Sequence, residues 1–162
     1  MNIRSLRNIT SQARQEGFTL VEILVVVGIL AILLAITLVA INPNQHFQDS
    51  RNSQRSSNVT AILDAIYEYE SSHSGNVPPS LSAVTSAVQI GAGTGHIDLC
   101  ADIVPADIAD LPLDPTNSTK ASGADCSSGT YETGYTIAKS TSNRFTVAAP
   151  SAEGGVTISV TR

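Results

Sequence analysis

The feature that most constrains this chain is an apolar run from Phe18 to Ile41. Within the run, residues 23–41 are bulky aliphatic residues or alanine, apart from Gly28 and Thr37. As an α-helix the run extends about 36 Å, which is enough to cross the ~30 Å hydrocarbon core of a bilayer. Beyond Ile41, serine, threonine, asparagine, aspartate and glycine dominate. The sequence therefore indicates a membrane segment joined to a small polar domain, not a soluble globule with one uniform core.

The charged residues are segregated as well. Residues 1–17 hold three arginines against one glutamate; the whole chain has nine basic and fourteen acidic side chains, which leaves −7 on residues 18–162. Positive residues ahead of an apolar run keep that end in the cytoplasm, so we expect the C-terminal domain outside it. An acidic domain also argues against direct nucleic-acid binding, because lysine and arginine supply most of the affinity for phosphate.

The N-terminal segment fits two general classes of apolar segment poorly. A secretory signal peptide has an apolar region of roughly 7–15 residues and an A-x-A-like cleavage site, whereas this run is longer and no clear site closes it. An ordinary transmembrane anchor explains the length but not Glu22, which lies among apolar residues. Glu22 either reaches water at the cytoplasmic interface or meets a positive group inside the membrane. The residues alone leave both explanations open.

The segment Arg14–Ile23 reads RQEGFTLVEI and is followed by a continuous aliphatic stretch. It resembles the start of a type IV prepilin or of a type II secretion pseudopilin. The resemblance implies that a prepilin peptidase cuts after Gly17, removes residues 1–17 and N-methylates Phe18. It also implies that Glu22 pairs with the N-terminus of a neighbouring copy during polymerisation. The leader is longer than in many prepilins, and Pro43 lies beyond the apolar run rather than inside it.

After the membrane segment, residues 42–74 are predicted to continue the helix in amphipathic form. Pro43 either kinks it or unwinds a short stretch. Apolar residues then recur at helical spacing and predict a stripe that packs on the rest of the domain: Val59, Ile62, Leu63 and Ile66, with Tyr69 close behind. The preceding polar residues are expected to be exposed: Gln48, Arg51, Gln54 and Arg55. The helix should end near Ser74.

Residues 75–162 are predicted to form a small globular head. A short helix is expected where Leu81, Val84 and Val88 follow Ser80, and a flexible loop at residues 91–95. From Tyr135 onward apolar residues alternate with threonine, alanine or serine, which predicts about three antiparallel strands. The expected fold class is α+β, with the long helix packed on a small antiparallel sheet.

A core with so few aromatic residues would benefit from a covalent link. Cys100 and Cys126 are the two cysteines of the chain, and both lie in the domain expected outside the cytoplasm. In that compartment a disulfide is favoured over a metal site or free thiols. We therefore predict a bond between Cys100 and Cys126.

The head carries no catalytic motif, so no enzymatic activity is predicted. His46, His73 and His96 are scattered and begin no metal motif. The acidic stretch that ends at Asp114 and Asp125 contains the oxygen ligands that Ca²⁺ prefers, and some pseudopilins of this layout carry Ca²⁺ in the equivalent loop. Its spacing matches no defined calcium loop, which favours a solvated acidic surface without a cofactor.

The resemblance implies a filament subunit held in the inner membrane by one helix, with its head outside the cytoplasm. An assembly platform and its ATPase would extract it from lipid into a helical homopolymer, a cell-surface type IV pilus used for adhesion, motility or DNA uptake. An alternative in the same family is the major pseudopilin of a type II secretion system. An alternative of another class is a membrane-anchored binding module that never polymerises.

Overall fold

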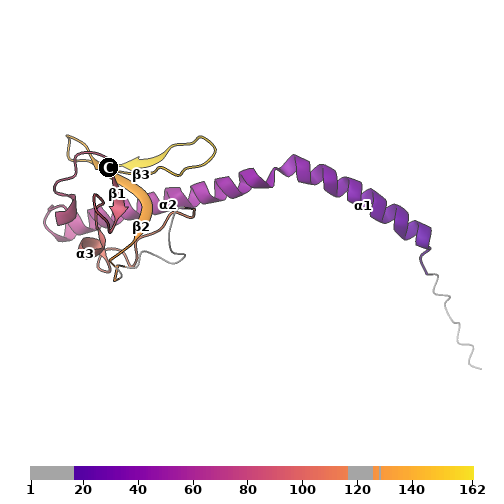
Figure 1. Cartoon of the computed structure of the whole chain (residues 1–162), viewed down its shortest axis with the longest axis horizontal. Helices are drawn as coiled ribbons and strands as arrows, with labels where there is room; N and C mark the ends of the chain where they lie inside the picture. The colour runs from indigo at the N-terminus through magenta and orange to yellow at the C-terminus, as the bar shows by residue number, and fades with distance from the viewer. Residues whose placement is uncertain (1–16, 117–125, 128) are drawn as a thin grey trace, which may run out of the picture. The chain divides into compact units, whose positions relative to one another are not determined.

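The chain divides into two compact units, Met1–Asn42 and Pro43–Arg162 (Figure 1). The structure is a computed structural model and describes residues 17–116, 126–127 and 129–162. In the first unit, helix α1 spans Leu20–Ile41. Asn42 is its C-cap and has a left-handed backbone, with a φ of 43°. Helix α2 begins at Pro43, because the first turn of a helix does not need the backbone N–H that proline lacks. Two outcomes were predicted at Pro43, a kinked continuous helix or a short unwound stretch. The second is observed, because Asn42 alone separates α1 from α2.

Helix α2 spans Pro43–Ser72 and provides one wall of the core of the second unit, Pro43–Arg162, which is called the head from here on. The predicted stripe is confirmed, because its four aliphatic side chains are fully buried: Val59, Ile62, Leu63 and Ile66. Tyr69 packs against the same core while remaining partly exposed. The helix ends close to its predicted end, and Gly75, with a φ of 85°, lies in the turn that follows.

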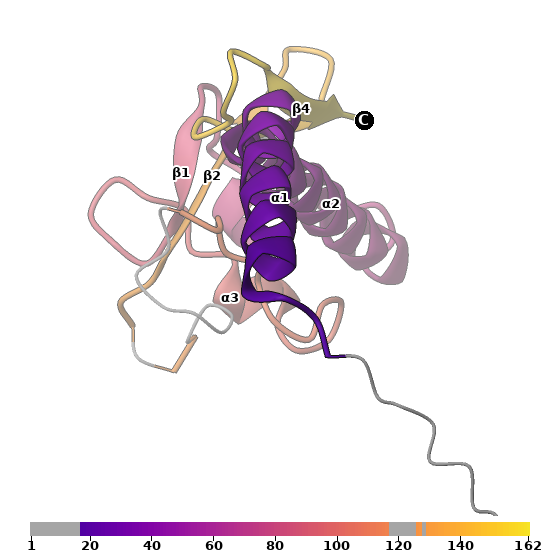
Figure 2. The ribbon, with the colours of Figure 1, turned by 90° about the vertical axis from the view of Figure 1, so that its right-hand side faces the viewer.

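The other wall is a four-stranded antiparallel sheet of strands β1 (Val88–Gly91), β2 (Glu132–Lys139), β3 (Phe145–Ala149) and β4 (Ile158–Thr161). The strands lie in sequence order, and Figure 2 shows β1 and β2 side by side. Ile137 of β2 is paired with Val147 of β3, which is paired with Val160 of β4. Strands β3 and β4 contact α2. The predicted α+β class is confirmed.

The short helix predicted between Ser80 and Val88 is wrong. Pro79–Leu81 forms one 3-10 turn, η1, and Val88 begins β1, which makes the sheet one strand larger than expected. The local spacing of apolar residues indicates a helix, but pairing of Val88 with Ile137, far along the chain, places the segment in the sheet. Such tertiary pairing outweighs local preference in a short segment.

The loop after β1 was expected to begin at Gly91, but Gly91 is the last residue of that strand. A Cβ on Gly91 would lie 2.7 Å from the carbonyl oxygen of Tyr131, so only glycine allows this close approach. The loop leads to α3 (Cys100–Ile103), a short helix that contacts α2. The glycine at position 91 is therefore explained by backbone packing.

Candidate processing and assembly site

The residues around the predicted cleavage position are open to solvent. Phe18 is 80% exposed, and a Cβ added to Gly17 would have no atom within 4 Å. Thr19 is the N-cap of α1, and its Oγ1 accepts a hydrogen bond from the backbone N–H of Glu22 at 3.2 Å. This cap fixes where the helix begins. The Gly17–Phe18 bond therefore lies just outside the helix, in accessible chain without regular secondary structure.

Glu22 lies in the first turn of α1, where the partial positive charge of the helix N-terminus favours a carboxylate. No residue of α1 is buried. Thr37, the other polar side chain in the helix, donates its hydroxyl to the carbonyl of Leu34 at 3.0 Å, so its hydrogen bond stays within the helix. In the described part of the chain, α1 is the one helix long and apolar enough to span a membrane.

A cluster of charged side chains lies inside the head and is centred on Arg55. Arg55 was expected to be exposed, and that expectation is wrong, because it is fully buried. Its Nε donates to Asp114 Oδ2 at 2.7 Å and its Nη2 donates to Asp114 Oδ1 at 3.2 Å. The remaining N–H groups reach Asn52, Thr116 and Glu153. The guanidinium is buried because it continues the apolar stripe, four residues before Val59.

Glu153 connects this cluster to the turn between β3 and β4. Arg51 holds the carboxylate in a bidentate pair, with Nε and Nη2 each 2.6 Å from a carboxylate oxygen. Asn52 exchanges two hydrogen bonds with the backbone of Glu153, at 2.9 and 3.0 Å. Hydrogen bonds from Arg51 and then Arg55 lower the pKa of Glu153 to about 2. The turn is therefore clamped to α2 by charge-assisted bonds.

Asp114, one of the two calcium candidates, is fully buried against Arg55. Burial alone would raise the pKa of Asp114, but hydrogen bonds from Arg55 and Thr116 outweigh it and lower the pKa. Its charge is thus already compensated by a guanidinium. Asp125, the second candidate, lies outside the described residues. Over the described ranges, no three histidine, cysteine or acidic side chains converge as metal ligands.

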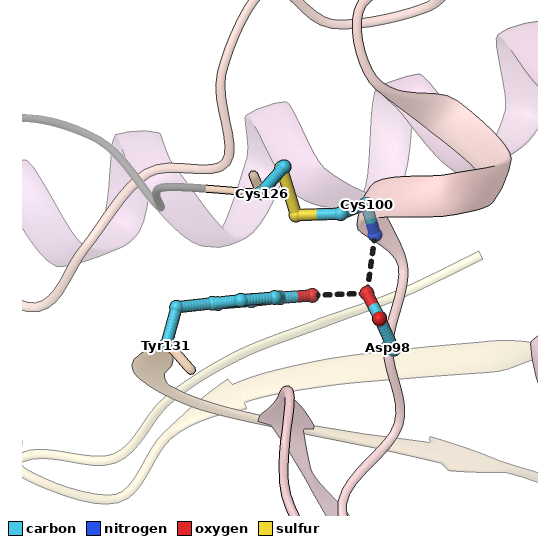
Figure 3. Close-up of a disulfide and its surroundings, with 4 residues drawn as sticks. All are labelled: Asp98, Cys100, Cys126 and Tyr131. Carbon is cyan, nitrogen blue, oxygen red and sulfur yellow. Dashed lines mark hydrogen bonds between the residues drawn. A yellow bond between two sulfur atoms is a disulfide. The ribbon is translucent and has the colours of Figure 1, made fainter. Parts of the chain in front are cut away.

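The predicted disulfide between Cys100 and Cys126 is present (Figure 3). Asp98 lies beside it, and its Oδ1 accepts hydrogen bonds from the Cys100 N–H at 2.9 Å and from the Tyr131 hydroxyl at 2.7 Å. The two bonds join α3 to the residue that precedes β2. Burial first, and then the bond to Asp98, raises the pKa of Tyr131 well above its ordinary value, so Tyr131 stays a donor.

The three histidines lie apart in the described structure. His46 is exposed on α2, and His73 is exposed in the turn just after it, where it stacks on Tyr69 with ring centroids 3.9 Å apart. His96 is half-buried in the loop after β1, where its Nδ1 would lie 3.1 Å from a Cβ on Gly93. These positions give no shared site.

The N-terminal segment thus combines two features. The Gly17–Phe18 bond is accessible and precedes a capped helix, and that helix, α1, is largely apolar and has no buried residue. Residues 12–38 match the family described as the prokaryotic N-terminal methylation motif. No curated protein and no solved structure matches the chain significantly. The motif, which ends inside α1, marks the chain as a type IV pilin-like prepilin with a class III signal peptide.

Proposed function

We propose that the processed chain, which begins at Phe18, is a structural subunit that polymerises into a type IV pilus. The observation that carries this proposal is the surface of α1, most of which lies within the methylation motif and which exposes apolar side chains on every face. The motif itself implies processing by a prepilin peptidase and self-assembly into filaments. The role is structural, with no catalysis by this chain.

A helix that is apolar all round is stable only where an apolar environment surrounds it. Lipid provides that environment before assembly, and a bundle of identical helices provides it afterwards. Moving α1 from one to the other leaves its apolar surface covered, so extraction has a low cost in hydrophobic free energy. An inner-membrane assembly platform with its ATPase would supply the work and the direction. The arginines before the helix would keep that end cytoplasmic and place the head outside.

Glu22 is the residue that would align neighbouring copies. An α-amino group titrates near pH 8, so a new N-terminus at Phe18 is largely positive at neutral pH. At about 4 Å and an effective dielectric constant of about 20, a carboxylate and an ammonium group attract by about 4 kcal/mol before desolvation is subtracted. In an apolar filament core, the register that brings Glu22 to a neighbour's N-terminus would be favoured over others.

The proposal is tested by the mass of the N-terminal peptide from isolated membranes, combined with imaging of cells for extended surface fibres. We expect an N-methylated Phe18 terminus and fibres built from this chain. A Gly17→Leu variant should retain residues 1–17 and form no fibres. Because nothing lies within 4 Å of a Cβ at Gly17, that loss would report on processing rather than on folding.

The alternatives give different outcomes in the same experiment. A processed subunit found in short periplasmic assemblies, without surface fibres, would identify a secretion pseudopilin. A monomer that begins at Met1 and never crosslinks to itself would identify an anchored binding module. Either outcome contradicts the pilus proposal.

A further inference from the structure

The basic residues of the head are distributed unevenly over the sheet. Lys139 ends β2 and is paired with Phe145, the first residue of β3. Arg144 immediately precedes Phe145, and Arg162 exchanges two backbone hydrogen bonds with it, at 3.0 and 3.1 Å. The described head has two other basic residues, Arg51 and Arg55, and both are bound to carboxylates. The remaining positive charge therefore lies at one end of the sheet, on an otherwise acidic domain.

Of these three cations, Lys139 has the most freedom to bind something else. Arg162 forms an ion pair with Asp64, and Arg144 donates to the carbonyl of Thr161 at 3.4 Å. The ammonium of Lys139 lies over the ring of Phe145, 5.4 Å from its centroid. Glu70 lies close enough for the charge of Lys139 to act on its pKa, but within the described structure no carboxylate forms an ion pair with Lys139.

Lys139 lines a surface pocket of about 240 Å³. The turn between β2 and β3 forms one side, with Ser140, Thr141 and Asn143, and the loop after η1 forms the other, with Ser82 and Thr85. Val84, which is almost completely buried, provides an apolar contact between these polar groups.

Several of the polar groups in this pocket are available to a ligand. Ser82 donates its hydroxyl to the carbonyl of Pro79 at 2.7 Å, and Ser140 accepts from the N–H of Arg144. In the described structure, by contrast, the side chains of Thr85, Thr141 and Asn143 make no hydrogen bond. The pocket thus offers two hydroxyls, one amide and one ammonium group, together with a small apolar surface.

We propose that this pocket binds one residue of an anionic saccharide, a sugar ring that carries a carboxylate or a sulfate. The ammonium of Lys139 would meet the anionic group. Hydroxyl and amide groups both donate and accept, which matches the hydroxyls of a sugar, while Val84 would contact the C–H face of the ring. The pocket is too small for a folded peptide segment, and a lone cation does not provide the row of phosphate contacts that nucleic acids require. This inference does not depend on polymerisation.

The test is an NMR titration of the full processed chain in detergent micelles with the glucuronate-containing disaccharide of hyaluronan. We expect the resonances of Lys139, Thr141 and Asn143 to shift. The neutral disaccharide chitobiose should bind at least about tenfold more weakly, because it lacks the charged group. Lys139→Gln should weaken binding of the acidic disaccharide by a similar factor. Arg144→Gln removes the same charge next to the pocket but not from its lining, and should change affinity less than twofold.

Four results would overturn the proposal. Equal losses in Lys139→Gln and Arg144→Gln would show a diffuse attraction for anions rather than a site. Equal binding of chitobiose would remove the role of charge. The same shifts with inorganic sulfate, at the same concentration, would show that the sugar ring contributes nothing. Tighter binding of a short single-stranded oligonucleotide to the same residues would assign the pocket to nucleic acid.

Discussion

Arg55 combines two properties that rarely occur together, full burial and full charge. A guanidinium has five N–H donors, and in this structure each has an acceptor, because Nε bonds Asp114, Nη1 bonds Asn52 and Glu153, and Nη2 bonds Asp114 and Thr116. Arginine, and not lysine, suits such a position, since its planar fork matches a carboxylate in two places.

Removal of Arg55 is expected to destabilise the head strongly. Arg55→Met should lower the free energy of unfolding by about 3–5 kcal/mol, because it takes the guanidinium away from the buried carboxylate of Asp114. Arg51→Met provides a matched control. It removes one partner of a partly exposed pair and should cost much less than Arg55→Met. Urea denaturation followed by circular dichroism measures both.

A third variant separates the buried charge from the lost packing. Arg55→Met combined with Asp114→Asn keeps an acceptor for the N–H of Thr116 but removes the negative charge of the buried carboxylate. It should recover part of the stability that Arg55→Met loses. If the double variant is no more stable than Arg55→Met, the lost packing of the Arg55 side chain, rather than the buried charge of Asp114, explains the effect.

The pH dependence of stability follows from the same two carboxylates. The pKa values of Glu153 and Asp114 are both lower in the folded state than their ordinary values near 4. Their contribution is therefore complete above about pH 5 and is lost as the pH falls from about 4 through the folded pKa, about 2 for Glu153. Melting temperatures recorded from pH 7 to pH 2 should stay level and then fall. In the acid range, unfolding of the Glu153→Gln variant should take up fewer protons than unfolding of the wild-type chain, by as much as one. An unchanged acid slope in that variant would contradict the assignment.

At the scale of whole elements, the sequence predicts those parts of the fold that a repeating pattern specifies. The 3.6-residue spacing of Val59, Ile62 and Ile66 locates the buried face of α2, and the two-residue alternation in β2 and β3 locates two strands. The same spacing, extended back by one turn from Val59, reaches Arg55, so a signal for its burial was present. Nothing in the sequence indicates its partner, because Asp114 lies 59 positions away in a segment without periodicity.

Strand β1 shows the opposite limit of sequence prediction. A segment of four residues is too short to show the two-residue alternation of a strand. It is a strand because it pairs with β2, more than forty positions later. The disulfide could be predicted because it needs only two cysteines and an oxidising compartment. Which residues lie around it, such as Asp98 and Tyr131, depends on the loop conformation, and the sequence does not specify that.

The disulfide should be a major source of stability for the head. Its cysteines are 26 positions apart, and closing a loop of that length is worth about 3 kcal/mol in the chain-entropy description. We expect Cys100→Ala combined with Cys126→Ala to lower the free energy of unfolding by about that amount in urea. Addition of reductant to the wild-type chain should give the same stability. Two alkylatable thiols in the exported protein would show that the bond does not form there.

On the scale of the whole molecule, the two compact units differ in the side chains that they present. The first presents apolar side chains along α1, with Glu22 and Thr37 as its two polar ones, whereas the second has its own core, its own ion pairs and a disulfide. Substitutions in α1 should therefore affect membrane insertion or filament assembly and leave the folding of the head unchanged. This separation makes assembly defects distinguishable from folding defects.

Glu22→Ala is the sharpest test of assembly. We expect normal removal of the leader, with a peptide that begins at Phe18, and normal stability of the head, because Glu22 lies outside that unit. Fibres should be lost or sparse, since the helix loses its one charged group for alignment with a neighbour's N-terminus. Thr37→Ala is the control: it removes the other polar side chain of the helix, one bonded only to its own backbone, and should assemble normally. Fibre counts by electron microscopy and the N-terminal peptide mass are both needed. Normal fibres from Glu22→Ala would show that register is set by the packing of apolar side chains alone.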